Sequence, residues 1–340
     1  MSSRLDVDKN IWTKFNDNFF VKYYNDTKIN VISLPLLFNL WRDIKGKDLV
    51  HIQYIFSTST AIAILYASLL GKPIVLSSRG ALCKWCLAQG SKYKNIWLKV
   101  MIKPYLKNIS WHATAEQEKN EILNVFPEAK VNIIPNGIEY EKFQIFNKLD
   151  ITKYTEKYIG EKIDASKIVV SMGRLQKKKG FDILIDAFEK VTKIDSSIIL
   201  LIAGQDEGEK LNLLEQIKSL NLEKNVFLVG NIEGQDKIDF FANANLFALT
   251  SHNENFGNVY IESLASGTPI IASKGTPWSE VEDYNCGRWV DNNALDMGNA
   301  IIEVLKKDTK EMMENSRKLA KKYDWSIIAN NFKNYYSSVI

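Results

Sequence analysis

The chain has 340 residues, of which 46% are hydrophobic and 25% charged, so it is long enough for two ordinary globular domains. Three cysteines exclude a disulfide framework, and with only three histidines the Cys83/Cys86 pair is expected to be two half-buried thiols. We expect no metal site and no cofactor. No apolar run reaches the roughly 20 residues of a membrane span, and residues 1–10 lack the apolar core of a secretory signal, which favours a cytoplasmic protein.

The charge is unevenly distributed. Residues 1–135 hold 18 Lys and Arg against 10 Asp and Glu, a net charge of +8, whereas residues 136–340 carry −4. A basic half attracts anions, such as a membrane surface or a phosphate-bearing acceptor, unless it is only a solvated lysine-rich surface. Residues 91–107 interleave five lysines with apolar side chains, which predicts either membrane contact or a surface helix packed on the sheet. Without a nucleic-acid motif, we expect no nucleic-acid partner.

Short apolar runs alternate with helical patterns, which is typical of parallel α/β architecture. The predicted strands are 49–53, 73–77, 110–114, 131–134, 167–172, 197–203, 226–229, 246–250 and 269–272. Helical stretches fill the intervals, and three of them close the chain. The pattern predicts two doubly wound domains joined near 136–165. Their ligands are expected at the carboxyl ends of the strands, in a cleft that the two domains face.

A helix start is predicted after the strand that ends near Thr250. The helix is expected to begin near Phe256 or Gly257, where glycine lets a ligand approach the backbone closely. Backbone N–H groups at a helix start have no partner within the helix and form an anion site. Here these groups belong to Gly257, Asn258 and Val259.

Two glutamates flank this helix start. Glu254 precedes it and Glu262 follows eight residues later, about 12 Å along a helix axis. A nucleotide sugar has the right span, with its sugar near Glu254, its diphosphate at the helix start and its ribose near Glu262. The alternative is that Glu254 is only a charge at the helix N-terminus and that Glu262 is a solvated residue. The small residues 263–267 beside Glu262 argue against it, because a carboxylate in such packing usually has a partner.

A cationic loop follows another predicted strand. Gly173 ends that strand, Arg174 emerges from its carboxyl end, and Lys177, Lys178 and Lys179 precede an amphipathic helix. Cations at this edge would neutralise a diphosphate and stabilise charge on a leaving group. Three lysines in a loop are also common on a solvated surface.

The chain from about Asp48 onward resembles glycosyltransferase family 4, a group of mostly bacterial retaining enzymes with the GT-B fold. The resemblance rests on motifs in the family's order: IPNGI at 134–138, GRLQKKKG at 173–180, LIAG at 201–204, E-x7-E at 254–262 and SGTPII at 266–271. Residues 78–82, 276–280 and 286–290 look like members that build bacterial surface polysaccharide, including lipopolysaccharide.

The resemblance implies an α/β, GT-B protein with two Rossmann-like domains. The acceptor-side domain is expected at 1–140, the nucleotide-sugar domain at 141–323, and a final helix at 324–340 that crosses back to the first domain. Family members usually open with a strand and a glycine-rich loop. Neither is recognisable here, so we expect the first domain to lack its first strand or strands.

The resemblance also implies roles for single residues. Arg174 and Lys179 would bind the donor diphosphate and Glu254 the transferred sugar, and these three are the expected catalytic residues. Glu262 would bind the ribose. Further donor-binding residues would be Gly173, Phe256, Gly257, Asn258 and Val259, with Asn231 and Ile232 at the nucleotide base. Acceptor-side candidates are His112 and Arg79, which stands where many relatives have a histidine.

The expected function is transfer of a hexosyl group from a UDP- or GDP-sugar to a glycan or lipid-linked acceptor, with retention of configuration. The expected location is the inner face of the plasma membrane, in surface polysaccharide biosynthesis. Two alternatives stay open. One is a nucleotide-sugar epimerase of similar fold, for which we find no acid/base set. The other is an inactive partner protein that binds nucleotide sugar without transferring it.

Overall fold

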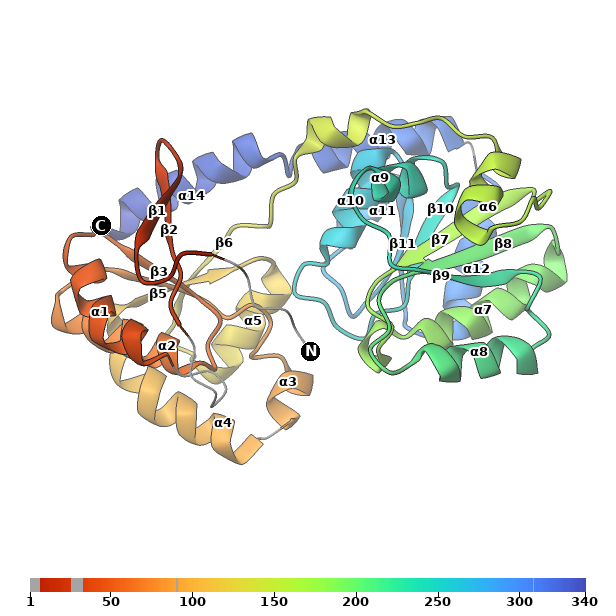
Figure 1. Cartoon of the computed structure of the whole chain (residues 1–340). Coiled ribbons are helices and arrows are strands. Elements are labelled where there is room, and N and C mark those ends of the chain that lie inside the picture. Colours follow the sequence, from red (N-terminus) through yellow and green to blue (C-terminus); the bar gives the residue numbers. More distant parts are fainter. Residues whose placement is uncertain (1–6, 26–32, 90, 308) are drawn as a thin grey trace. The chain divides into compact units, whose positions relative to one another are not determined.

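The computed structural model describes residues 7–25, 33–89, 91–307 and 309–340 (Figure 1). The chain divides into two compact units. Unit 1 comprises Met1–Ile134 and Asn331–Ile340, and unit 2 comprises Pro135–Asn330. Each unit has its own parallel sheet and its own buried apolar core.

Unit 1 contains a four-stranded parallel sheet in the order β3-β4-β5-β6. The strands are β3 (Val50–Gln53), β4 (Ile74–Ser77), β5 (Ile109–Ala113) and β6 (Lys130–Ile133). The helices are α1 (Leu34–Lys45), α2 (Thr58–Leu69), α3 (Lys84–Ala88), α4 (Ser91–Trp97) and α5 (Glu116–Val125), with a π-helical turn at Leu98–Ile102 and a 3-10 turn at Lys103–Asn108. An antiparallel hairpin of β1 (Trp12–Asn16) and β2 (Phe19–Lys22) stands outside this sheet.

Unit 2 contains a six-stranded parallel sheet in the order β12-β11-β10-β7-β8-β9. The strands are β7 (Lys167–Met172), β8 (Ile198–Ala203), β9 (Val226–Gly230), β10 (Leu246–Leu249), β11 (Ile270–Ser273) and β12 (Gly287–Val290). The helices are α6 (Ile151–Ile159), α7 (Phe181–Ile194), α8 (Lys210–Ser219), α9 (Gly234–Ala242), α10 (Asn258–Ser266), α11 (Glu280–Asp283), α12 (Ala294–Leu305) and α13 (Thr309–Lys321), with 3-10 turns at Tyr140–Gln144 and Lys177–Lys179. Through α14 (Trp325–Val339) the chain passes from unit 2 back into unit 1.

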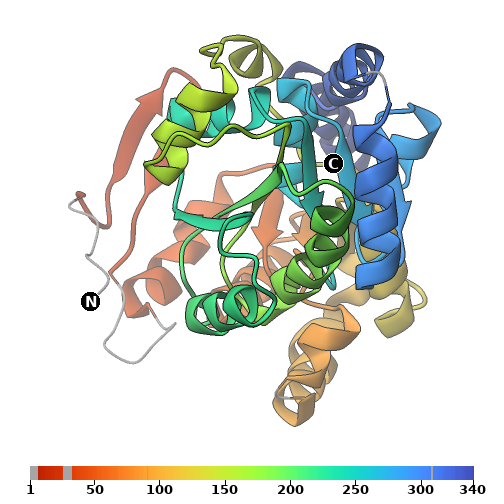
Figure 2. The same cartoon turned by 90° about the vertical axis from the view of Figure 1, so that its right-hand side faces the viewer.

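Helices cover both faces of the unit 2 sheet. In Figure 1, α7, α8 and α12 lie on one side, and α9, α10 and α13 on the other. Figure 2 shows α12, in blue, beside α7, in green. All six residues of β8 are buried, which explains its unbroken apolar sequence, since a central parallel strand is covered on both faces. The sheet therefore has the doubly wound arrangement that the sequence predicts.

Every strand predicted from the sequence is present, with ends within one or two residues of the expected ones. The prediction missed three strands. The sequence of β12 is Gly-Arg-Trp-Val, which is too short and too polar to be recognised as a buried strand. The hairpin strands β1 and β2 are almost entirely exposed, so they show no alternation of buried and exposed positions.

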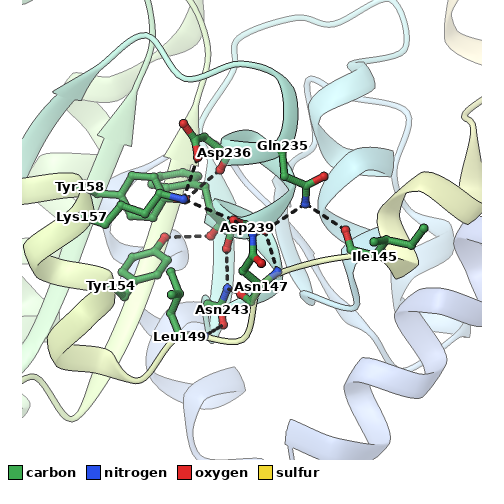
Figure 3. A network of polar contacts seen from close by, with 11 residues as sticks. Ile145, Asn147, Leu149, Tyr154, Lys157, Tyr158, Gln235, Asp236, Asp239 and Asn243 are labelled. Carbon is green, nitrogen blue, oxygen red and sulfur yellow. Dashed lines mark hydrogen bonds and ion pairs between the residues drawn. The ribbon is translucent and has the colours of Figure 1, made fainter.

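A buried carboxylate of unit 2, that of Asp239, binds the chain segment that connects β6 to β7 (Figure 3). Asp239 on α9 is 1% exposed and accepts hydrogen bonds from the backbone N–H and the side-chain amide of Asn147, at 2.9 and 2.8 Å. Gln235 and Lys157 also donate to it, at 3.1 and 3.3 Å. Burial opposes ionisation, but these hydrogen bonds, led by those from Asn147, hold the pKa of Asp239 below its ordinary value.

The Asp239 network gives a stability prediction. Asp239→Asn leaves donors of Asn147 and Lys157 facing an amide, so the free energy of unfolding should fall by about 1–3 kcal/mol, measured by urea titration. Asp236→Asn is the matched control, because Asp236 pairs with the same lysine but is 63% exposed. It should cost at most about 1 kcal/mol. Equal effects of the two changes would show that the buried network adds nothing.

Candidate functional site in unit 2

The site lies where the strand order of unit 2 reverses. From β7 the chain builds the sheet outward through β8 and β9, and then returns to β10 on the other side of β7. The carboxyl ends of β7 and β10 are therefore neighbours, and ligands of doubly wound sheets bind at such a point. The loops after the two strands touch directly. The N–H of His252 donates to the carbonyl of Lys178 at 2.9 Å, and the Thr250 hydroxyl donates to the carbonyl of Gly180.

Glycines make this approach possible. Gly180 has a φ of +64°, and a β-carbon there would lie 2.2 Å from the carbonyl oxygen of Thr250. A β-carbon on Gly204, which follows β8, would lie 1.8 Å from the carbonyl oxygen of Gly173. No side chain fits at such distances, so both positions require glycine. The aliphatic stem of Lys179 runs over Gly173, 3.2 Å from where a β-carbon would be.

Lys179 and Glu254 form an ion pair across the two loops, with Nζ 2.6 Å from Oε1. Their side chains are 14% and 12% exposed. The Ser251 hydroxyl donates to the same carboxylate oxygen at 2.8 Å. Because this pair is largely shielded from water, its geometry is well fixed, and the two charges that the sequence assigns to the donor lie side by side.

A pocket of about 300 Å³ opens beside this ion pair. Such a volume is at the lower end of the range for small-molecule sites. Its lining consists of Asn136, Met172, Gly173, Lys179, Glu254, Asn255, Phe256, Gly257, Asn258, Val259 and Glu262. The structure thus brings together one lysine, two glutamates and the start of α10, as the sequence predicts.

Hydrogen bonds to the backbone hold the loop before α10 in place. Gly257 caps the helix with a φ of +78°, and a β-carbon there would lie 2.7 Å from the ring of Tyr260. The indole N–H of buried Trp278 donates to the carbonyl of Phe256 at 2.7 Å, and the N–H of Glu254 donates to the carbonyl of Gly275 at 3.1 Å. The first residues of α10, which line the pocket, are therefore held in a fixed backbone conformation. Helix starts of this kind bind anions through their N–H groups.

Glu262 has a cationic neighbour that the sequence did not suggest. Lys237 on α9 places Nζ 2.7 Å from Oε1 of Glu262, and the two side chains are 27% and 19% exposed. On the opposite side of the helix start, the Asn136 side chain donates to Asn258 at 2.9 Å. A ligand hydroxyl group that binds Glu262 would share the carboxylate with Lys237.

Three predicted donor residues lie outside the described lining of this pocket. Arg174 is 61% exposed and pairs with Glu207 at 2.9 Å. The Asn231 side chain donates to Glu233 at 2.7 Å, and Ile232 packs against the unit 2 core. For Arg174 to reach a diphosphate, its side chain must exchange Glu207 for the ligand, which an exposed ion pair permits at little cost.

The acceptor-side candidates lie in unit 1, at the carboxyl ends of its strands. Arg79 follows β4 and is exposed, and its Nε donates to Oε1 of Gln53 at 2.6 Å. His112 in β5 is 1% exposed, so it lies below the surface. Its Nε2 lies 2.8 Å from the carbonyl oxygen of Ile134, which can only accept, so Nε2 carries the proton.

His112 belongs to a chain of hydrogen bonds that is buried at His112, half-buried at His51, and reaches α14. With Nε2 protonated, Nδ1 of neutral His112 accepts from the Ser77 hydroxyl at 2.7 Å. Ser77 in turn accepts from Nε2 of His51 at 2.8 Å, and Nδ1 of His51 accepts from the Tyr336 hydroxyl at 2.6 Å. Burial, then the charges of His112 and Arg79, lower the pKa of His51 to about 4. His112 therefore supports the fold of unit 1 and does not reach its surface.

Sequence reasoning missed four residues that contact the predicted site residues Glu254, Phe256 and Glu262: Lys237, Ser251, Gly275 and Trp278. Trp278 lies in a motif that was noted only for its resemblance. Among the residues that the structure describes, no group of three His, Cys, Asp or Glu is placed to hold a metal ion. Over the same residues, no helix is long and apolar enough to cross a membrane.

Comparison with known proteins identifies the family. The family model of "Glycosyl transferases group 1" matches residues 153–323, which is half of the chain and contains the whole sheet of unit 2. The chain belongs to this family. The family model thereby confirms the resemblance read from the motifs at 173–180 and 254–262.

The curated relatives include proteins of Streptococcus pneumoniae and Staphylococcus aureus. The alpha-monoglucosyldiacylglycerol synthase of Streptococcus pneumoniae is 27% identical over 238 residues, which are 68% of this chain and 52% of that one. The capsular polysaccharide biosynthesis glycosyltransferase CapM of Staphylococcus aureus is 33% identical over 170 residues, 48% of this chain and 43% of that one. The chain thus spans about half the length of these relatives.

Solved structures confirm the GT-B fold. Anabaena HepE, solved in complex with UDP, superposes with a TM-score of 0.74 at 20% identity, covering 89% of this chain and 82% of that one. The sucrose-phosphate synthase of Thermosynechococcus elongatus gives 0.70 at 18% identity, covering 96% and 85%. The α/β architecture with two Rossmann-like domains, predicted from the sequence, is therefore that of the family.

The low pKa of His51 predicts how this family member responds to acid. His51 is neutral in the folded chain down to about pH 4, but in the unfolded chain it takes up a proton near pH 6.5. Its contribution to stability is therefore present above pH 6.5 and is lost as the pH falls toward 4. The loss should be on the order of 3 kcal/mol.

The measurement compares the wild type with His51→Gln by urea unfolding at pH 7 and at pH 4.5. The stability difference between the two proteins should shrink at the lower pH, because glutamine does not titrate. A difference that stays constant would mean that His51 is not held neutral.

Proposed function

We propose that the chain is a glycosyltransferase that binds a nucleoside-diphosphate sugar in the pocket of unit 2 and transfers the sugar, with retention, to an acceptor bound by unit 1. The observation that carries the proposal is the convergence of Lys179, Glu254, Glu262 and the start of α10 on one pocket. A cation and a helix N-terminus complement a diphosphate. The two carboxylates complement hydroxyl groups on either side of it.

In the proposed reaction the acceptor hydroxyl attacks the anomeric carbon from the side of the leaving group. The bond between that carbon and the diphosphate oxygen breaks, and the departing diphosphate takes the acceptor's proton. No side chain of the described pocket is placed as an obvious nucleophile, which favours this front-face route over a double displacement. Lys179, Arg174 and the N–H groups of α10 would stabilise the charge that develops on the diphosphate.

The donor is a UDP- or GDP-sugar, and the HepE complexes with UDP and UDP-glucose favour UDP. The acceptor is a glycan or lipid-linked molecule at the inner face of the plasma membrane. This assignment draws on relatives named for a glycolipid and for capsular polysaccharide. Arg79 is the acceptor-side residue exposed at the carboxyl edge of unit 1, and His112 lies beneath it.

The segment 91–107 favours contact with an anionic membrane. Leu98 and Ile102 are buried against unit 1, so part of its apolar surface packs on the sheet. Tyr93, Ile96 and Val100 nevertheless remain 84%, 61% and 56% exposed, next to lysines and without an acidic residue in the segment. Exposed apolar side chains among lysines match the interface of an anionic bilayer.

The donor site is tested with UDP and uridine. Glu262→Ala should weaken both, by about 10- to 100-fold, because charge-assisted hydrogen bonds to the shared ribose contribute about 1.5–3 kcal/mol each. Lys179→Ala should weaken the binding of UDP and leave the binding of uridine unchanged, because Lys179 contacts only the diphosphate. Calorimetry measures both affinities, after a thermal-shift panel of UDP and GDP selects the nucleotide.

The matched controls are Glu215→Ala and Lys218→Ala, which change exposed residues of α8 outside the pocket. Both should bind UDP like the wild type. Unchanged UDP affinity in Glu262→Ala would contradict the assignment of the pocket. Donor binding without hydrolysis or transfer would instead favour an inactive partner protein.

Membrane contact is tested by co-sedimentation with phosphatidylglycerol vesicles. The wild type should bind at low salt and be released as salt rises, since surface lysines contribute up to about 1 kcal/mol each and are screened within about 10 Å. Changing Lys92, Lys99 and Lys103 to Glu should abolish binding. Lys94 is left intact because its ammonium donates to the carbonyl of Cys86.

The control changes Lys148, Lys218 and Lys224, three exposed lysines of unit 2, to Glu. It alters the net charge equally and should keep vesicle binding. Equal loss of vesicle binding in both triple variants would show that binding depends only on the net charge of the protein.

A further inference from the structure

The loop after β4 has an unusual backbone. Arg79 has a φ of +53°, in the left-handed region, between buried Ser78 and Gly80. A non-glycine residue adopts this conformation only when its surroundings enforce it, because the β-carbon crowds the backbone. Such strain concentrates where a side chain must point in one direction for function.

A buried carboxylate enforces this conformation. Glu118 on α5 is 2% exposed and accepts hydrogen bonds from both sides of Arg79: from the Ser78 hydroxyl at 2.7 Å and from the N–H of Gly80 at 2.8 Å. Its other oxygen accepts from the N–H and the hydroxyl of Thr114, at 2.8 and 2.9 Å. The carboxylate thus joins the loop after β4 to the loop after β5 and fixes the backbone on either side of Arg79.

The side chain of Arg79 is oriented as well. Gln53, the last residue of β3, accepts from its Nε at 2.6 Å. The guanidinium group is therefore held at the carboxyl ends of β3, β4 and β5, where parallel sheets bind their ligands. The nearby imidazoles of His51 and His112 are neutral at pH 7, since both pKa values are lowered. Arg79 therefore places a cation at this edge, in the half of the chain with a net charge of +8.

We propose that the loop 78–80 is an anion-binding element that holds a phosphate group of the acceptor, with Arg79 as the contacting residue and Glu118 as a positioning residue. The planar guanidinium matches phosphate oxygens in two parallel hydrogen bonds, which an ammonium group cannot do. The inference rests on the proposed function, because it names the chemical class of that reaction's acceptor. The phosphate belongs either to a polyprenyl diphosphate carrier or to a phospholipid headgroup.

Two soluble probes distinguish these sources by calorimetry on the full chain: farnesyl diphosphate, and dihexanoyl phosphatidylglycerol below its micelle concentration. Saturating UDP is present to occupy the pocket of unit 2. The wild type should bind one probe and should not bind farnesol. Arg79→Gln should weaken that binding at least 10-fold, whereas Arg42→Gln, at another exposed arginine of unit 1, should not.

A second variant separates function from folding. Arg79→Asn places a residue that tolerates the left-handed conformation, so its melting temperature should equal or exceed that of the wild type while probe binding is lost. A structural role for Arg79 would lower the melting temperature instead. Glu118→Gln should weaken probe binding, and it should add no further loss in the Arg79→Gln background, because it acts only through Arg79.

The proposal is overturned if the wild type binds neither phosphate probe, or if Arg79→Gln binds them as tightly as the wild type. Additive losses for Glu118→Gln and Arg79→Gln would overturn the positioning role of Glu118. The proposed function fails separately, if no nucleotide binds unit 2, and that outcome leaves the measurement on Arg79 unaffected.

Discussion

The contact between the loops after β7 and β10 is the constraint on which the site in unit 2 depends. These strands are neighbours in the sheet but lie about 75 residues apart in the chain, so their loops meet only after the sheet has formed. The Lys179–Glu254 ion pair and the backbone bonds beside it hold the two loops together. Shielding from water strengthens the attraction between the two charges but costs desolvation, and the hydrogen bond from Ser251 to the carboxylate offsets part of that cost. The cation and the carboxylate therefore take their positions from the fold, before any ligand binds.

Steric limits explain the glycines of the same region better than flexibility does. Gly180, Gly204 and Gly257 each lie so close to backbone or ring atoms that a β-carbon cannot be accommodated. Two loops and a helix start can thereby approach within van der Waals contact beside the pocket. The positive φ of Gly257 also turns the chain where the first residues of α10 line that pocket.

The sequence predicts what is local and periodic. Apolar runs such as Ile198–Ala203 can be recognised as buried strands, and the spacing of Glu254 and Glu262 around a helix start suggests their shared pocket. Partners from other elements escape such reasoning. Lys237 reaches Glu262 from α9, and Glu118 reaches the loop 78–80 from α5, through packing that no spacing encodes. The sequence also cannot show that Arg174 pairs with Glu207, because an exposed side chain has several reachable carboxylates.

The topology of unit 1 divides its positive charge between two places. Strands β4 and β5 are parallel, so the connection between them must start at the carboxyl edge of the sheet and return to the amino edge. Arg79 opens this connection, and Lys103–Asn108 closes it at the opposite edge. The lysines of 91–107 and the guanidinium of Arg79 are therefore two separate anion-attracting features of one crossover. A single electrostatic surface would respond to both sets of substitutions alike. Two separate features predict that changing the lysines abolishes vesicle binding but leaves binding of the soluble phosphate probe intact.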